Sequence, residues 1–418
     1  MVWDGGGNVA PQLLIARWLV ERGHEVRVLG HRSLRDRIER IGAAFSGFAK
    51  APEGDSSRPE SDLIRDWEGR TPIGAFARTR DNLMFGPALE FAQDVIATAE
   101  GWPPDVIAFD YLLLGAGIGA ERLGMPSAIL VHTPYPLPTE GVPPFGQGLM
   151  PATRWPGRVR DKVLARGFDL LFAPGLKAAN AARRELGMGP LGHYSEQLHH
   201  ANVALVLTSA AFDFAGSAEL PPNVRYVGPV LDRRAEPGGW DSPWPDDHPH
   251  PLVLASFSTT FQGQRDLAER VLAALDGLPV RCLLTSGPAL DLGGIRIPPN
   301  VSQRRFVPHA AVLRHTDLVI THAGLGTVHA ALASAVPLLC IPDGRDQNDT
   351  AARVVAAGAG LRARRKVSPR RLRQLIVAGL ESEGLREHAG RMANLFAAED
   401  GATRAGEEIE ALAVGQVS

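Results

Sequence analysis

Residues 317–350 contain the side chains best suited to hold a phosphorylated ligand. They read DLVITHAGLGTVHAALASAVPLLCIPDGRDQNDT, in which a buried strand pattern precedes His322, Gly324 and Gly326, and Thr327 opens a helix pattern. A glycine-rich turn before a helix offers unpaired backbone N–H groups and the positive end of a helix dipole, which together bind anions. His322 can add a hydrogen bond or a positive charge to the same oxygens. The stretch therefore predicts a pyrophosphate site, with a purely structural turn as the alternative.

A second glycine run lies close to the start of the chain, in MVWDGGGNVAPQ. Three glycines and Asn8 precede a helix pattern at residues 11–22, and glycine lets a ligand approach the backbone closely. That ligand can be a phosphate or another group, and these residues alone leave the choice open.

Alternating strand and helix patterns surround both loops. The first half has strand patterns at 23–30, 104–110, 126–132 and 202–209, and helix patterns at 11–22, 33–41, 73–100, 113–124 and within 157–200. The second half has strand patterns at 251–258, 280–287, 300–307, 317–322 and 337–342, and helix patterns at 265–275, 327–334 and 383–414. Strands that alternate with helices favour parallel sheets covered on both faces.

Residues 228–250 divide the chain, because GPVLDRRAEPGGWDSPWPDDHPH combines proline, glycine, aromatic side chains and charge. We therefore expect an α/β protein with two doubly wound, Rossmann-like domains, residues 1–227 and 251–418, joined by this linker and ending in a helical tail. The expected ligand site is the cleft where the carboxyl ends of the two sheets face each other.

The totals are those of an ordinary globular protein of 418 residues, 44% hydrophobic and 22% charged. A formal net charge of −2 gives no reason to expect nucleic acid or anionic lipid as a partner. Cys282 and Cys340 lie in apolar runs and are expected to be buried thiols rather than a disulfide. No apolar stretch reaches the roughly 18 residues of a membrane span. No signal peptide is visible, so we expect a cytoplasmic protein.

These motifs resemble those of the family 1 glycosyltransferases, which have the GT-B fold. The resemblance covers nearly the whole chain: GNVAPQLLIARWLVERGHEV, FDYLLLGAGIGAERLGMPSAIL, VRYVGP, LVLASFSTTF and RFVPHAAVLRHTDLVITHAGLGT, followed by the pair Asp346-Gln347. Within this family, the chain most resembles the bacterial branch that glycosylates macrolides, enediynes and other natural products. It implies an inverting transfer of a sugar from a dTDP- or UDP-sugar to a hydrophobic small molecule, with no metal or separate cofactor. It also implies that the last helix returns to the N-terminal domain.

The resemblance implies a set of donor-binding residues. Domain 251–418 would bind the nucleotide sugar, and domain 1–227 the acceptor. His309 replaces the family's usual glutamine, so the nucleotide base stays open. The implied contacts are His322, Gly324, Gly326 and Thr327 to the pyrophosphate, Ser258 or Thr259 to a phosphate, Val307 and His309 to the base, and Asp346 and Gln347 to the sugar hydroxyls.

In this family the first loop reads G-H-x-x-P, and its histidine removes the proton from the acceptor. Gly7 and Pro11 keep that frame, but Asn8 stands at the base position, and an amide has no basic site near neutral pH. The usual partner of the missing histidine aligns with Asp110. Asp110 acting as base, an acceptor acidic enough to need little help, and weakened or lost catalysis remain as explanations. Purely structural roles, a helix cap for Asp110 and a turn for Asn8, are also open.

Only Met1-Val2-Trp3 precede the first loop, where the family has a longer first strand. A start assigned too late is favoured over a truncated strand, because a lost central strand would expose the edges of its neighbours.

The irregular segment 46–72 and the proline-rich loop 133–151 favour a large acceptor pocket. Gly7, Trp67, Phe85, Tyr135 and Phe145 are the candidate acceptor contacts, although each aromatic residue is equally compatible with plain core. A homodimer is one assembly that the sequence allows.

Three other functions are alternatives to glycosyl transfer. The series Gly115, Gly117 and Ala120 fits a G-x-G-x-x-A dinucleotide fingerprint, but its glycines fall inside a helix pattern, and His132 stands where a ribose-binding acid is expected. Close packing of the helix on the sheet is therefore favoured. A nucleotide-sugar 2-epimerase shares the fold and needs no acceptor. A family member that binds its ligands without turnover would fit Asn8.

Overall fold

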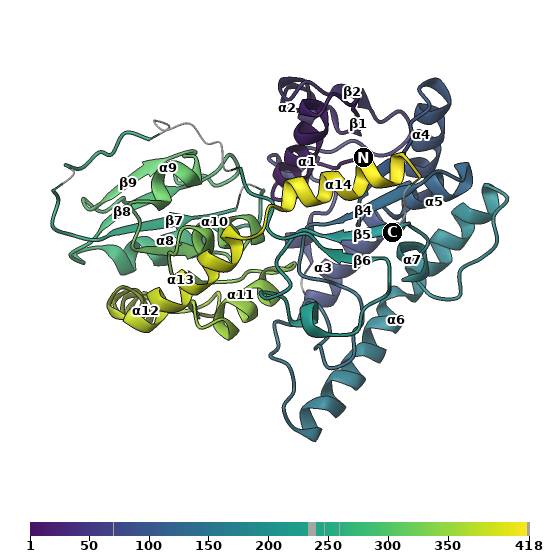
Figure 1. The fold of residues 1–418 in the computed structure, drawn as a ribbon. Helices are drawn as coiled ribbons and strands as arrows, with labels where there is room; N and C mark the ends of the chain where they lie inside the picture. The colour runs from purple at the N-terminus through teal and green to yellow at the C-terminus, as the bar shows by residue number, and fades with distance from the viewer. Residues whose placement is uncertain (70, 233–239, 246, 259, 416–418) are drawn as a thin grey trace. The chain divides into compact units, whose positions relative to one another are not determined.

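The computed structural model describes residues 1–69, 71–232, 240–245, 247–258 and 260–415 (Figure 1). The chain forms two compact units, residues 1–144, 151–230 and 400–418 in the first, and residues 145–150 and 231–399 in the second. The chain therefore passes between the units four times, once inside the expected linker 228–250. No helix in the described ranges is both long and apolar enough to cross a bilayer.

The first unit contains two parallel sheets, one of four strands in the order β3-β4-β5-β6 and one pair, β1-β2. Between them, the Met1 carbonyl accepts a hydrogen bond from Asp110 N, and Val2 N donates to the Leu29 carbonyl. The strands are β1 (Arg27–Gly30), β2 (Ala44–Gly47), β3 (Ile107–Asp110), β4 (Ser127–Val131), β5 (Val203–Val206) and β6 (Val224–Tyr226).

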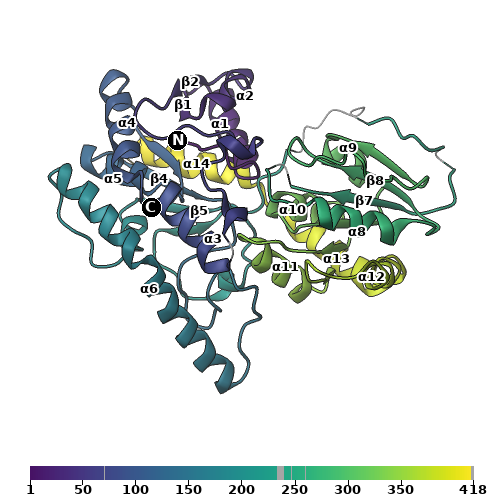
Figure 2. The same cartoon turned by 180° about the vertical axis from the view of Figure 1, so that it is seen from behind.

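Helices cover these sheets, and the alternation matches the predicted α/β pattern (Figure 2). They are α1 (Val9–Glu21), α2 (Arg35–Arg40), α3 (Pro72–Thr79), α4 (Ala88–Gly101), α5 (Leu114–Leu123), α6 (Trp155–Glu185), α7 (Glu196–His199) and α14 (Gly401–Ala413). One π-helical turn (Arg80–Met84) and four 3₁₀ turns (Arg32–Leu34, Pro59–Ser61, Asp66–Glu68 and Phe214–Ser217) complete the unit.

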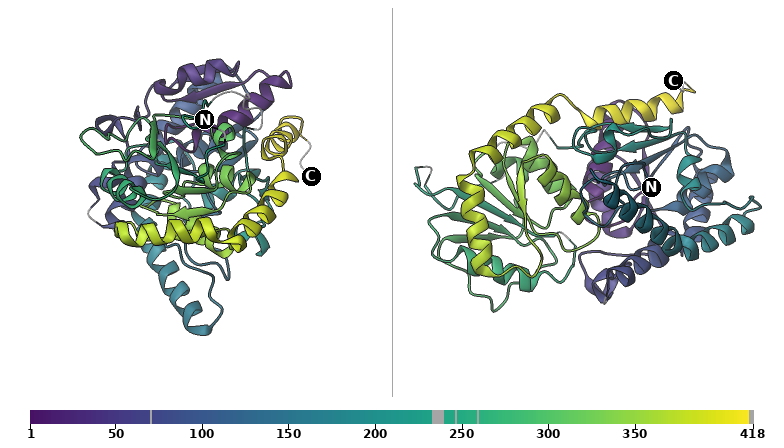
Figure 3. Two further views of the ribbon diagram at one scale, coloured as in Figure 1. Left: turned by 90° about the vertical axis from the view of Figure 1, so that its left-hand side faces the viewer. Right: turned by 90° about the horizontal axis from the view of Figure 1, so that it is seen from below.

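The second unit is built on a six-stranded parallel sheet in the order β12-β11-β10-β7-β8-β9. Its strands are β7 (Leu252–Ser256), β8 (Arg281–Thr285), β9 (Val301–Arg304), β10 (Leu318–Thr321), β11 (Leu338–Cys340) and β12 (Gly360–Arg362). Its helices are α8 (Arg265–Leu275), α9 (His309–Leu313), α10 (Leu325–Ala333), α11 (Gln347–Ala356), α12 (Pro369–Glu381) and α13 (Glu383–Ala397). Helix α12 packs on α8, and α13 packs on α10 (Figure 3).

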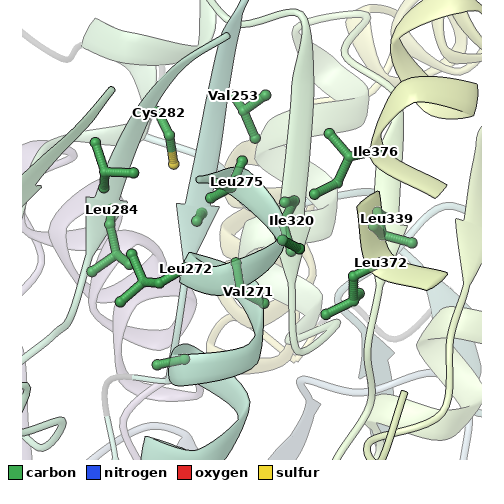
Figure 4. Close-up of a cluster of buried hydrophobic side chains, with 14 of the residues drawn as sticks. Val253, Val271, Leu272, Leu275, Cys282, Leu284, Ile320, Leu339, Leu372 and Ile376 are labelled. Carbon is green, nitrogen blue, oxygen red and sulfur yellow. The ribbon is translucent and has the colours of Figure 1, made fainter. Parts of the chain in front are cut away.

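The core of the second unit lies between its sheet and helices α8 and α12 (Figure 4). Val253, Cys282 and Ile320 project from the sheet toward Leu272 of α8 and Leu372 of α12, and all five are buried. Both cysteines are free thiols buried among apolar side chains, as predicted, and burial raises the pKa of each to about 12.

The last helix returns to the first unit, which confirms the expectation for the C-terminus. Helix α14 packs along α1, so closely that a side-chain carbon at Gly406 would come within 2.1 Å of the Trp18 ring. Glu410 accepts hydrogen bonds from Arg22 at 3.1 and 3.2 Å, and His24 lies 2.6 Å away.

Several predicted boundaries were wrong, each for a local reason. The pattern at 73–100 is not one helix, because a side chain at Gly86 would meet the Asp81 carbonyl at 1.7 Å and Pro87 follows. The pattern at 383–414 is two helices, and the second is capped by Asp400, which accepts from Thr403 N. The short strands β2, β6 and β12 were not predicted.

The glycines of α5 serve helix packing and not a dinucleotide. A side-chain carbon at Gly115 would lie 2.2 Å from the Ala88 carbonyl oxygen, and one at Gly119 would lie 3.0 Å from the Ala92 carbonyl oxygen. These two glycines let α5 approach the backbone of α4, whereas the sequence favoured close packing of the helix on the sheet. Gly117 has the predicted surroundings, because a side-chain carbon there would lie 3.0 Å from the Phe109 ring of β3.

We expect Gly115→Ala to lower the free energy of unfolding by about 1–3 kcal/mol, because the methyl group forces α4 and α5 apart. Gly167→Ala in α6 is the matched control: no atom lies within 4 Å of its added carbon. That variant should be more stable by about 0.5–1 kcal/mol, as alanine favours helix. Denaturant unfolding of both variants tests the contrast, and equal stabilities would contradict it.

Candidate active site

Asn8 closes the glycine turn at the start of α1, and its side chain is buried. Its Nδ2 donates to the Trp3 carbonyl at 3.0 Å and to Asp110 Oδ2 at 2.9 Å, while its Oδ1 accepts from Gly5 N at 3.1 Å. A side-chain carbon at Gly5 would lie 2.8 Å from that same Oδ1, so the turn requires glycine there. The amide therefore both shapes the loop and fixes a carboxylate.

Asp110 is the centre of a buried polar cluster at the carboxyl end of β3. Its Oδ2 accepts from Gln12 Nε2 at 2.5 Å as well as from Asn8, its Oδ1 accepts from Leu112 N at 3.0 Å, and His132 Nδ1 lies 3.2 Å from Oδ2. Burial alone would raise the pKa of Asp110, but the His132 ring and these donors outweigh it and hold the pKa below its usual value. Asp110 is therefore a carboxylate at neutral pH.

His132 reaches this cluster because it directly follows β4. Strands β3 and β4 are parallel, and Asp110 pairs with Leu130. Side chains two residues apart on a strand share a face, so His132 lies on the face of the sheet that carries Asp110. The Tyr111 ring contacts the imidazole, with a centroid distance of 5.1 Å.

Asp4 directly precedes the three glycines of the first loop and holds the start of that loop in place. Its carboxylate accepts from Ser33 Oγ at 2.7 Å and from Ser56 Oγ at 3.1 Å, and its backbone N–H donates to His31 Nδ1 at 3.2 Å. These contacts join the first loop to the residues after β1 and to the segment 51–58. The first loop is thus held from both ends.

The turn after β10 has the geometry of an anion site. Gly324 is the N-cap of α10, and a side-chain carbon there would come within 2.7 Å of His322 Nε2, so the imidazole packs against the helix start. At Gly326, by contrast, a side-chain carbon would meet nothing within 4 Å. Open space therefore adjoins the first N–H groups of the helix, which have no partner within it. Ala323 holds the turn at a φ of 69°, a left-handed conformation that is strained for alanine.

His322 is buried and neutral at neutral pH. Burial lowers its pKa to about 4, with a contact to the Ser256 backbone opposing and the charge of Arg345 reinforcing the shift. The imidazole can therefore offer a hydrogen bond but not the positive charge that the sequence also allowed. Arg345 is the nearby permanent charge: its Nη1 donates to Thr260 Oγ1 at 3.2 Å, and its backbone adopts a strained φ of 53°.

A hydrogen-bonded network links the loop after β7 to the loop after β11. Ser258 Oγ shares a hydrogen bond of 3.0 Å with Thr260 Oγ1 and accepts one of 3.1 Å from Gln262 Nε2. Gln262 Oε1 accepts from Gln347 Nε2 at 2.9 Å, and Gln347 Oε1 accepts from the backbone N–H groups of residues 343–344. The Gln347 amide is thus buried and holds the two loops together.

Two family models match the chain. "Erythromycin biosynthesis protein CIII-like, C-terminal domain" covers residues 280–412, and "Glycosyl transferase 4-like domain" covers residues 5–191. The 4'-demethylrebeccamycin synthase of Lentzea aerocolonigenes is 31% identical over 417 residues, which are 98% of this chain and 97% of that protein. The chain is a family 1 GT-B glycosyltransferase. It belongs to the natural-product branch of that family, and it uses a nucleotide sugar.

Solved structures share the fold of this glycosyltransferase. The calicheamicin glycosyltransferase CalG4 matches with a TM-score of 0.74 and 20% identity over 100% of this chain and 97% of that one. Glycosyltransferase VinC, solved in complex with dTDP, matches with a TM-score of 0.68 and 19% identity over 99% of this chain and 98% of that one. The GT-B fold is therefore established, and the oxidoreductase alternative is excluded.

The remaining donor residues predicted for the glycosyltransferase lie in the second unit. His309 begins the short helix α9, and is not in a loop, and Val307 before it is buried. Thr327 and Asp346 are half-buried, and Asp346 is the N-cap of α11. Thr259 lies outside the described residues.

The predicted acceptor residues lie in different local surroundings. Gly7 is exposed with nothing within 4 Å of an added carbon, and Trp67 is half-buried in a 3₁₀ turn. Phe85 packs in an apolar cluster against Phe172 of α6, so its role there is core packing. Tyr135 lines a small apolar recess in the first unit beside Val131 and Leu198, and burial raises its pKa to about 12. Phe145 belongs to the second unit.

Sequence reasoning missed three residues of this glycosyltransferase. His132 ends a strand pattern and Gln12 lies in a helix pattern, and nothing in either stretch marks them as site residues. Both contact Asp110, which is far from each of them in the sequence. Arg345 gave one local signal, since it directly precedes the acid-glutamine pair.

The segment 145–150 is fastened to the second unit by Asp349. The Asp349 carboxylate is buried and accepts from Gly146 N at 2.5 Å and Gly148 N at 3.1 Å, while Arg362 Nη1 donates to the Gly148 carbonyl at 2.7 Å. Burial raises the pKa of Asp349 to about 6, against opposing effects of Arg353 and the two backbone donors. Segment 145–150 is therefore anchored on α11.

This shift predicts a pH dependence of stability. The ordinary pKa of the carboxyl is 3.8, so between about pH 4 and 6 the folded protein holds the Asp349 proton more tightly than the unfolded chain. The contribution of Asp349 to stability is therefore largest below that window and falls by on the order of 2–3 kcal/mol as pH rises through it. Asp349→Asn should remove this fall while keeping an acceptor oxygen. Parallel unfolding curves of both proteins from pH 4 to 7 would contradict the prediction.

Proposed function

We propose that this glycosyltransferase moves a sugar from a dTDP- or UDP-sugar to a hydrophobic natural-product aglycone, with inversion at the anomeric carbon. The observation that carries the donor half is the turn before α10, where His322 packs on Gly324 beside the open space over Gly326. A diphosphate placed there meets helix N–H groups, the positive end of the helix dipole and an imidazole.

The reaction is a single displacement. The acceptor oxygen forms a bond to the anomeric carbon, the bond from that carbon to the diphosphate oxygen breaks, and its electron pair leaves with the nucleoside diphosphate. Groups that stabilise this departing charge commonly contribute several kcal/mol to catalysis, about 3–4 for one well-placed donor. In this proposal the helix start and His322 supply hydrogen bonds, and Arg345 supplies the charge that neutral His322 lacks.

The base of the nucleotide is proposed to bind at the segment before α9. Phe306 is 74% exposed, and its ring offers a face on which a base can stack. Val307 and His309 follow it directly. VinC, a protein of the same fold, was solved in complex with dTDP, which supports a dTDP-sugar as the donor. We assign the binding of the sugar hydroxyls to Asp346. The Gln347 side chain holds the surrounding loops in place.

The acceptor half is assigned to the first unit, at the glycine turn around Gly7. The relative that carries the family assignment is a 4'-demethylrebeccamycin synthase, which supports a natural-product aglycone as acceptor. Two buried free thiols support the reducing interior of the cell as the location.

A thermal-shift series with dTDP, UDP, GDP and NAD tests the donor half. One nucleoside diphosphate should raise the unfolding temperature, because a ligand that binds only the folded protein stabilises it. The shift should be lost in His322→Ala. A shift with NAD alone, or none with any diphosphate, would contradict the proposed site.

A further inference from the structure

The residue at the family's base position cannot take a proton in this chain. Asn8 uses Nδ2 for Trp3 O and Asp110 Oδ2, and uses Oδ1 for Gly5 N. A carboxamide is not basic, and here its hydrogen bonds also hold the first loop to Asp110. The proton of the acceptor must go elsewhere.

Asp110 is poorly placed to take that proton directly. Its side chain is 0% exposed, and its oxygens already accept from Asn8, Gln12 and Leu112 N. A buried carboxylate held by several donors is a weak base, because each donor stabilises the ionised form. The arrangement suits an orienting role better than proton abstraction.

His132 is the basic side chain that this arrangement leaves. Its Nδ1 lies 3.2 Å from Asp110 Oδ2, and its side chain remains 12% exposed where that of Asp110 is wholly buried. In this structure Nδ1 makes no hydrogen bond with a described residue, so Asp110 acts on the ring through its proximity and charge. A carboxylate next to Nδ1 favours the tautomer in which Nδ1 carries the proton and Nε2 has the lone pair. Such contacts are often long before substrate binds.

We propose that His132, oriented by Asp110, is the general base for the acceptor, in place of the histidine missing from position 8; this rests on the proposed function above. The acceptor O–H proton moves to His132 Nε2 as the acceptor oxygen bonds to the anomeric carbon. The bond to the diphosphate oxygen breaks, and its electron pair leaves with the nucleoside diphosphate. Asp110 is a positioning residue that stabilises the resulting imidazolium.

The test compares two acceptors of similar shape, 4-nitrophenol and 4-nitrobenzyl alcohol, with the full-length enzyme and its sugar donor. A general base commonly contributes about 10²- to 10⁴-fold. His132→Gln should therefore lower kcat with the benzyl alcohol by about 100-fold or more, and lower it far less with the phenol once that is ionised. His132→Asn is the second variant, and unchanged unfolding curves show that either is folded.

A pH profile gives the second measurement. Among the described residues, the titratable side chains that contact His132 are Asp110 and Tyr111. The loss of kcat/KM with the benzyl alcohol at acidic pH should disappear in His132→Gln and persist in Tyr111→Phe. His193→Gln is the matched control, since His193 Nε2 lies 3.4 Å from Asp169 Oδ1 on the surface, and it should behave as the unchanged enzyme.

The outcomes separate this inference from the proposed function. Undiminished benzyl alcohol transfer by His132→Gln, or an equal loss with both acceptors, would overturn the base assignment alone. A wild-type enzyme that transferred no sugar to either acceptor from dTDP- or UDP-glucose, and bound neither diphosphate, would overturn the proposed function and this role with it.

Discussion

His322→Ala is expected to lower kcat/KM for the sugar donor by roughly 100-fold or more, the scale on which a single donor to a departing charge acts. The imidazole is buried, neutral and packed on the helix start. Its removal would take away the hydrogen bond that we propose it donates to the diphosphate, and in a buried site water does not readily replace such a bond. Steady-state kinetics with varied donor, together with calorimetric binding of the nucleoside diphosphate, measure the effect.

Three companion variants show whether the loss is specific. His322→Gln keeps an N–H donor and should recover part of the activity. His315→Ala, an exposed histidine of the same unit, should change neither binding nor turnover. Asn8→Ala, in the other unit, should leave diphosphate affinity close to that of the unchanged enzyme. Unaltered donor use in a folded His322→Ala protein would mean that the turn before α10 is structural only.

Arg183→Ala is expected to cause a large loss of stability, about 2–3 kcal/mol, since it leaves buried partners of a charge unpaired. The buried guanidinium donates to both Glu121 oxygens at 2.7 and 2.9 Å, to Gln197 Oε1 at 2.9 Å and to the Gly189 carbonyl at 2.7 Å. Those contacts join α5, α6 and the segment around α7. The estimate lies below that for a fully buried pair because Glu121 is partly exposed.

Arg184→Ala supplies the neighbouring control. Arg184 is exposed, and its replacement should change the free energy of unfolding by less than about 0.5 kcal/mol.

Burial alone would raise the pKa of Glu121, but Arg183, His200 and Gln197 lower it from 4.5 to about 2. The contribution of Glu121 is therefore complete above its unfolded pKa and lost as pH falls toward 2, a loss that Arg183→Ala should reduce. Equal stabilities of the two arginine variants would contradict the assignment.

The geometry of the turn before α10 could be predicted from sequence because the pattern that produces it is local. His322, Gly324 and Gly326 are within five consecutive residues between a strand and a helix, and each acts through its immediate neighbours. The parallel α/β architecture followed from alternating patterns for the same reason. The sequence singled out the Asp346-Gln347 pair as candidate sugar contacts. In the structure the Gln347 side chain joins two loops, and this contact depends on Gln262, which is eighty-five residues away in the sequence.

The polar cluster around Asp110 could not be predicted in this way, because its contacts come from three separate elements. Gln12 on α1 and His132 after β4 both meet Asp110, at sequence separations that no local pattern links. The anchoring of segment 145–150 by Asp349 is likewise a contact across 203 and 201 residues. The charge and the hydrophobic periodicity of a sequence do not predict which side chains, distant in the sequence, will contact each other at the edge of a sheet.

The most direct test of the account is release of nucleoside diphosphate from dTDP- and UDP-glucose, with and without 4-nitrophenol, and NMR of the product. The account predicts release that depends on the acceptor, and a glycoside whose anomeric configuration is opposite to that of the donor. Release without a glycoside, a glycoside of retained configuration, or no release from either donor would contradict it.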